Sequence, residues 1–217
     1  MLLFSNYSIK IRNYFSLVLS LMPVSFIAGN LIINLNILVL TISALLVFKK
    51  EIFNIKYLLI DKLLFLYFFL ILFTGIYNDY YFYLNELSWK GYFSTITKSL
   101  YFFKYLFLYI VLRFLIERDV IKLKFFFISC LITSLFVCLD IFFQFIYGQD
   151  IFGFEATNNG RKLSGPFGDE LIAGGFIQRF SIFSFFILPL FYSDKSKLLS
   201  KYLIPILFVI FLLLIIY

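Results

Sequence analysis

The chain has 217 residues, of which 63% are hydrophobic and only 14% are charged, and its net charge is +7. Soluble domains are roughly 45–50% apolar and about 25% charged, so this composition excludes an ordinary soluble domain. The basic residues lie in short clusters between long apolar runs and not on one polar face, so the positive charge does not predict a nucleic-acid partner.

Seven apolar runs have the length of transmembrane helices or come close to it, since a span needs about 20 mostly apolar residues. Backbone groups in lipid must pair within their own segment, so these runs predict helices. We therefore expect an all-α polytopic membrane protein with about seven spans, forming one transmembrane domain over residues 1–217. In chain order the runs are Tyr14–Gly29, Leu31–Phe48, Leu58–Tyr77, Phe93–Leu115, Phe125–Tyr147, Leu171–Tyr192 and Tyr202–Tyr217.

The two ends of this series have features of their own. The first two runs are separated only by the turn at Gly29 and Asn30, which predicts a tight helical hairpin. The seventh run stops at Tyr217 without a flanking charge, which predicts a truncated last helix. We therefore expect the chain to be the N-terminal part of a longer protein.

Most of the 19 Lys and Arg residues precede the first run or lie in every second loop after it. Cytoplasmic loops carry such an excess of basic residues, so the N-terminus is predicted to be cytoplasmic. We interpret the chain as a multi-pass protein of the bacterial inner membrane. The residues that set this orientation are Lys10, Arg12, Lys49, Lys50, Lys56, Lys62, Arg113, Arg118, Lys122, Lys124, Lys195, Lys197 and Lys201.

Three ionisable residues lie inside the apolar runs: Lys104, Asp140 and Arg179. Each costs roughly 2.5–3.5 kcal/mol to insert, and such residues usually face a bundle interior, a partner or a cavity. At about 1.5 Å of rise per residue, all three fall at a similar depth and can form one layer together with Gln144. Two compatible interpretations follow: a buried ion pair between Asp140 and Arg179 that fixes helix packing, or the polar floor of an outward-facing cavity.

A metal or cofactor is not predicted. The chain contains no His, which removes the commonest metal ligand and the commonest general base. Cys130 and Cys138 lie eight residues apart in one apolar run, which predicts inert buried thiols. The catalytic residues cannot be assigned from the sequence.

The segment before the sixth run, residues 158–170, is rich in glycine and carries the adjacent cations Arg161 and Lys162. A glycine-rich loop ahead of a helix N-terminus can cradle an anion, and the planar fork of Arg binds two phosphate oxygens at once. A solvated turn with incidental charge is the alternative. Asp169 and Glu170 then begin the sixth helix, either to complement its dipole or as catalytic carboxylates, and Gly174-Gly175 predicts close helix packing.

Residues 161–175 resemble a motif of the O-antigen ligase and polymerase superfamily of bacterial membrane glycosyltransferases. They include Arg161, Ser164, Gly165, Gly168 and the Asp169-Glu170 pair. Residues 140–148 and 150–153, and Pro23 with Gly29 in the first hairpin, are similar to the family pattern as well. The resemblance covers most of this chain but only the N-terminal half of a typical member.

The resemblance implies transfer of glycan from a polyprenyl-diphosphate carrier on the periplasmic side, without metal or nucleotide sugar, to a growing glycan, a lipid A-core or a protein. Arg161, with Lys162, would hold the diphosphate leaving group. The family's second half often supplies a functional His, which this chain lacks, and Lys104 stands where relatives often have Arg. Two alternative functions stay open: a transporter or flippase for an anionic lipid or glycan, and a non-catalytic membrane remnant.

Overall fold

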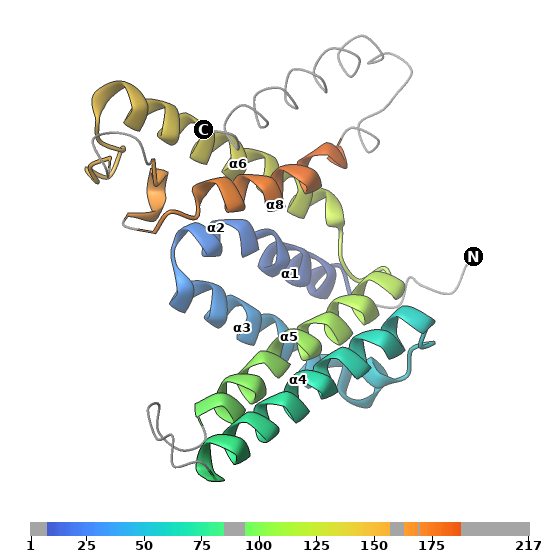
Figure 1. Cartoon of the computed structure of the whole chain (residues 1–217). Coiled ribbons are helices and arrows are strands. Elements are labelled where there is room, and N and C mark those ends of the chain that lie inside the picture. The colour runs from blue at the N-terminus through green and yellow to red at the C-terminus, as the bar shows by residue number, and fades with distance from the viewer. Residues whose placement is uncertain (1–7, 85–93, 157–162, 169, 188–217) are drawn as a thin grey trace. The chain divides into compact units, whose positions relative to one another are not determined.

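The computed structural model describes residues 8–84, 94–156, 163–168 and 170–187, and these residues are mostly helical (Figure 1). They contain no strand beyond an isolated bridge between Gln149 and Glu155. The helices are α1 (Ile9–Ser20), α2 (Met22–Ile27), α3 (Asn30–Phe48), the 3-10 turn η1 (Lys49–Phe53), α4 (Leu59–Leu84), α5 (Ser94–Glu117), α6 (Leu123–Tyr147), the 3-10 turn η2 (Gly165–Phe167) and α8 (Ala173–Phe185).

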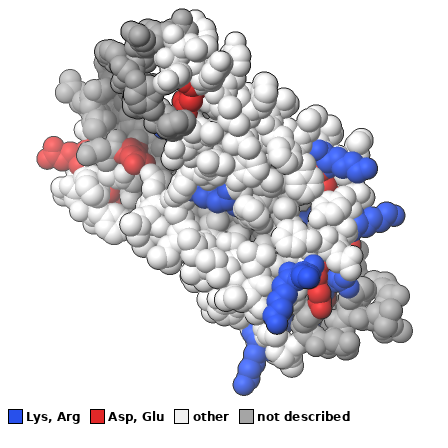
Figure 2. All heavy atoms as spheres, turned by 90° about the horizontal axis from the view of Figure 1, so that it is seen from below, with Lys and Arg blue, Asp and Glu red and all other residues white. Residues whose placement is uncertain are grey.

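Four of these helices are long and apolar enough to cross a membrane: α3 with its extension through η1, α4, α5 and α6. They correspond to the second to fifth predicted runs and indicate a membrane protein. Most of the described surface in Figure 2 is uncharged, as a lipid-facing surface requires. The count of about seven spans stays a prediction, because the seventh run and the end of the sixth lie outside the described residues.

Two predicted boundaries were wrong. The first run is not one continuous helix, because it breaks at Leu21 into α1 and α2. Pro23 lies in the first turn of α2, where its missing N–H costs no hydrogen bond, whereas in a helix interior it would break the ladder. The third run continues as α4 to Leu84, seven residues beyond its predicted end at Tyr77. This extension carries Asp79 to the start of α5, where its carboxylate accepts the N–H groups of Thr95 (3.1 Å) and Ile96 (2.8 Å).

The described residues form two compact units, one of residues 37–120 and one of residues 8–36 with 121–187. In the first unit α4 and α5 pack side by side (Figure 1). Phe68 lies against Phe102 and Phe103 in the middle of this pair, with ring centroids 5.6 and 5.8 Å apart. Gly75 meets Ser99 so closely that a Cβ on the glycine would lie 2.9 Å from the Ser99 Cβ.

A polar network joins the N-terminal end of α4 to the C-terminal half of α5. Asp61, only 1% exposed, accepts the Leu58 N–H at 2.5 Å through Oδ2 and the Tyr109 hydroxyl through Oδ1. The Arg113 Nε lies 3.7 Å from the same Oδ1. Asp61 thus completes the N-terminus of α4 and ties it to the neighbouring helix.

The second unit is built on α6, which packs against α1, α2, η2 and α8. Its apolar core joins Val137, Cys138 and Ile141 of α6 to Ala173, Phe176 and Ile177 of α8. Both cysteines of α6 are buried and free, as predicted. The first hairpin closes at Gly29, whose φ of +106° favours glycine, and its Phe26 and Ile27 pack on the same core.

Candidate functional site

Gln144 on α6 connects the helix to the two segments that follow it. Its side chain is fully buried. The amide oxygen accepts the Gly165 N–H at 2.9 Å, and the amide nitrogen donates to the Phe154 carbonyl at 3.2 Å and to Ser164 Oγ at 3.4 Å. A glutamine both accepts and donates, so one side chain can hold both segments at a fixed distance from α6.

Asp140, one turn earlier on α6, holds the loop of residues 148–156 against the helix. α6 ends at Gly148, whose φ of +77° lies in the left-handed region. The chain then turns back toward α6, so that the Ile151 N–H donates to Asp140 Oδ1 at 2.9 Å. Asp150 stabilises the loop from within, because its Oδ1 accepts the Phe154 N–H at 2.6 Å. The bonds from Ala156 N to Gly148 O and from Asp150 N to Phe154 O close the loop.

The predicted ion pair between Asp140 and Arg179 is not formed. Arg179 is exposed on α8, whereas Asp140 is fully buried and accepts a backbone N–H. The sequence argument placed Asp140 among helices alone and therefore sought a charged partner. It overlooked that the following loop can fold back over the last turns of α6 and supply a backbone donor.

The glycines of the predicted motif occupy backbone conformations that other residues avoid. Gly165, buried in η2, has φ +56°, and a Cβ there would lie 3.0 Å from Cγ1 of Ile141 on α6. Gly168 has φ +61°, and a Cβ there would lie 3.4 Å from the Phe154 ring. The glycines thus let the described part of the motif before α8, residues 163–168 and 170–172, approach both α6 and the 148–156 loop. We call this segment the motif loop.

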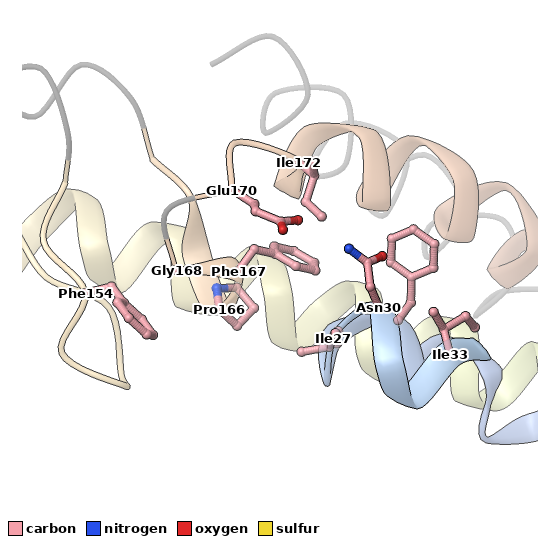
Figure 3. A pocket seen from close by; sticks show the side chains of 11 residues that line it. Ile27, Asn30, Ile33, Phe154, Pro166, Phe167, Gly168, Glu170 and Ile172 are labelled. Carbon is pink, nitrogen blue, oxygen red and sulfur yellow. The ribbon is translucent and has the colours of Figure 1, made fainter. Parts of the chain in front are cut away.

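A pocket of about 450 Å³ lies between the first hairpin and the motif loop (Figure 3). Aromatic and aliphatic side chains make most of its wall. Asn30 at the start of α3 and Glu170 of the motif loop are its polar side chains, and they point toward one another from opposite sides. The lining residues are Phe26, Ile27, Gly29, Asn30, Ile33, Phe154, Pro166, Phe167, Gly168, Glu170 and Ile172.

The predicted site residues are only partly brought together. Asp140, Gln144, Ser164 and Gly165 form one buried cluster, and Gly168 and Glu170 line the adjacent pocket. Lys104 belongs to the other compact unit, where its Nζ lies 3.9 Å from the centroid of the Tyr101 ring. Arg161, Lys162 and Asp169 lie outside the described residues.

Asn30, Asp150 and Phe154 were missed as site residues. A signal for Asp150 exists in the sequence, since an Asp followed three residues later by Gly is typical of a turn in which the carboxylate accepts a backbone N–H. No comparable signal marks Asn30 or Phe154, because the segments that they join are distant in the chain. Within the described part of the chain, no group of three or more His, Cys, Asp or Glu residues is arranged to hold a metal ion.

No protein-family model, curated protein or solved structure matches the chain. The similarity to the O-antigen ligase superfamily therefore remains a hypothesis that depends on residues 161–175 and the segments before them.

Proposed function

We propose that the protein takes part in cell-surface polysaccharide assembly as a glycan ligase or polymerase that uses a polyprenyl-diphosphate-linked donor. One observation carries the proposal: the motif loop forms a wall of a largely apolar pocket immediately after the cations Arg161 and Lys162 in the sequence. A donor of this class combines an apolar chain with a diphosphate and a glycan, and each part needs a different surface. The segment that lines the apolar pocket carries Glu170, and in the sequence it follows directly on the two cations.

The chemistry assigned to each residue follows from charge. Cleavage of the donor leaves negative charge on the diphosphate, and a guanidinium that binds two of its oxygens lowers the barrier. Arg161 has this role in the proposal and Lys162 assists it. Asp140 and Gln144 do not touch the donor but hold the loops around the pocket. The acceptor-activating group is not assigned.

The proposal is tested by glycan transfer in membranes that contain the full-length protein. Arg161→Ala should abolish transfer while the amount of protein in the membrane is unchanged, and Arg161→Lys should restore only part of it, because an ammonium lacks the bidentate geometry. Lys98→Ala, which removes an exposed cation from α5 that has no part in the predicted orientation, is the matched control and should transfer normally. Near-normal transfer by Arg161→Ala would contradict the assignment.

A further inference from the structure

Two buried carboxylates in the unit that carries the pocket each retain one oxygen without a partner. Asp140 is 0% exposed and Asp150 is 2% exposed. In each residue Oδ1 accepts a backbone N–H, whereas Oδ2 is buried and accepts no hydrogen bond. Buried polar atoms in folded proteins nearly always have a partner, so two such oxygens in one region indicate a ligand.

The two carboxylates belong to one cluster. Asp140 Oδ1 accepts the N–H of Ile151, the residue that follows Asp150, so the backbone beside Asp150 lies directly against Asp140. A Cβ built on Gly165 would lie 3.7 Å from Asp140 Oδ2, so the free oxygen faces the backbone of the motif loop. Residues of α6, the 148–156 loop and the motif loop thus surround the cluster.

No described cation neutralises this pair. Arg179 is exposed, and the ion pair between Arg113 and Asp61 lies in the other compact unit. Two ionised carboxylates buried without a counter-ion are unfavourable, both through desolvation and through mutual repulsion. A bound cation removes both costs.

We propose that Asp140 and Asp150 hold a divalent cation, Ca²⁺ in preference to Mg²⁺, which fastens the 148–156 loop to α6. Both ligands are hard carboxylate oxygens, which suit these ions. Ca²⁺ accepts six to eight oxygens in flexible geometry, so backbone carbonyls and water can complete its shell, whereas Mg²⁺ requires a nearly ideal octahedron. Zn²⁺ favours nitrogen and sulfur ligands, and the chain contains no His.

The cation is structural, and its binding does not depend on the proposed glycan transfer. Asp150 Oδ1 holds the Phe154 N–H, and the Phe154 ring lines the pocket against Gly168. An ion that fixes Asp150 against Asp140 therefore fixes one wall of the pocket. Removal of the ion should loosen the loop while the α6–α8 core, which has its own apolar contacts, remains packed.

The test is equilibrium binding of radioactive Ca²⁺ to the full chain in nanodiscs of zwitterionic lipid, which avoids binding of Ca²⁺ to anionic headgroups. The wild type should bind one ion per chain. Asp140→Asn and Asp150→Asn should each lose this binding, while Glu155→Gln should retain it. Glu155 is the matched control because it is an exposed carboxylate in the same loop.

A second measurement applies to the wild type alone and covers the case in which the variants do not fold. An ion that binds only the folded chain raises its thermal unfolding temperature, so Ca²⁺ should raise it relative to chelator and Mg²⁺ should raise it less. Absence of this shift, or equal Ca²⁺ binding by wild type and Asp140→Asn, would overturn the proposal. It would also be overturned by infrared evidence that the two carboxyls share a proton at neutral pH in a chain that binds no Ca²⁺.

Discussion

The two compact units use buried aspartates in different ways. In the α4–α5 pair, both oxygens of Asp61 are occupied, by a hydroxyl and a backbone N–H, and Arg113 lies nearby. In the α6 unit, Asp140 and Asp150 each use one oxygen to hold a loop and leave the other without a partner. The contacts of Asp61 are therefore complete within its own unit, whereas the free oxygens of Asp140 and Asp150 are where we propose that a cation binds.

The same contrast applies to the glycines. Gly75 lies where α4 and α5 approach most closely, and a Cβ would collide with Ser99. A Cβ built on Gly175 of α8 would meet no described residue within 4 Å, so close packing at Gly174-Gly175 stays a prediction. The α4–α5 pair is thus tightly fitted, whereas the glycines that matter in the α6 unit are Gly165 and Gly168 of the motif loop.

The largest effect is expected for Asp61→Ala. The substitution removes acceptors for the Leu58 N–H and the Tyr109 hydroxyl and leaves the partly buried Arg113 without its carboxylate. Loss of one partner from a buried ion pair costs roughly 3–5 kcal/mol. The free energy of unfolding, measured by detergent titration in mixed micelles, should fall by about this amount. Tyr109→Phe, which removes one hydrogen bond, should cost less, and an equal cost would show that Arg113 contributes nothing.

Gln144→Leu should have the next largest effect. The leucine leaves the buried Gly165 N–H without its acceptor, and a buried donor without a partner costs about 1–3 kcal/mol. Proteolysis should also reach the motif loop faster, because its tie to α6 is lost. Gln178→Leu is the matched control, since that side chain is exposed on α8. Equal behaviour of the two variants would argue against Gln144 as the link between the loops.

Gly75→Ala should destabilise the α4–α5 pair by roughly 1–3 kcal/mol through overpacking against Ser99. Gly175→Ala is the same substitution at a site where no described residue lies within 4 Å of the new Cβ, and alanine there should be neutral or stabilising by up to about 1 kcal/mol. Ser99→Gly should restore the stability of Gly75→Ala. Detergent titration of the single and double variants would measure these differences, and an unaffected Gly75→Ala would refute the close fit.

The smallest effect is expected for Asp140→Asn in the presence of chelator. The asparagine carbonyl can still accept the Ile151 N–H, and the substitution removes a buried charge that repels Asp150. Because the hydrogen bond is kept and only a repulsion is removed, the free energy of unfolding should change by less than about 1 kcal/mol. The variant should be less stable than wild type when Ca²⁺ is added, because only the wild type gains from binding. A large loss in chelator would make Asp140 structural in the same sense as Asp61.

The sequence predicted the spanning helices well because their signal is local. A long apolar run can satisfy its backbone only within itself, so the runs that became α3, α5 and α6 were found nearly at their observed bounds, as was the start of α4. The end of α4 was missed because the apolar run ends at Tyr77, whereas the helix continues past the polar Asp79, whose carboxylate caps α5. The motif loop and the polar positions of α6 were also recognised, since glycines and buried polar residues are unusual in such a sequence.

By itself, then, the sequence determined the composition of a membrane protein, its principal helices and the segments that carry polar chemistry. Only the tertiary structure decided the partners: Ile151 and not Arg179 for Asp140, Gly165 for Gln144, and the first hairpin opposite the motif loop in one pocket. The reason is physical. Helix formation in lipid depends on residues a few positions apart, whereas a buried polar atom binds whichever donor the folded chain brings within hydrogen-bond distance.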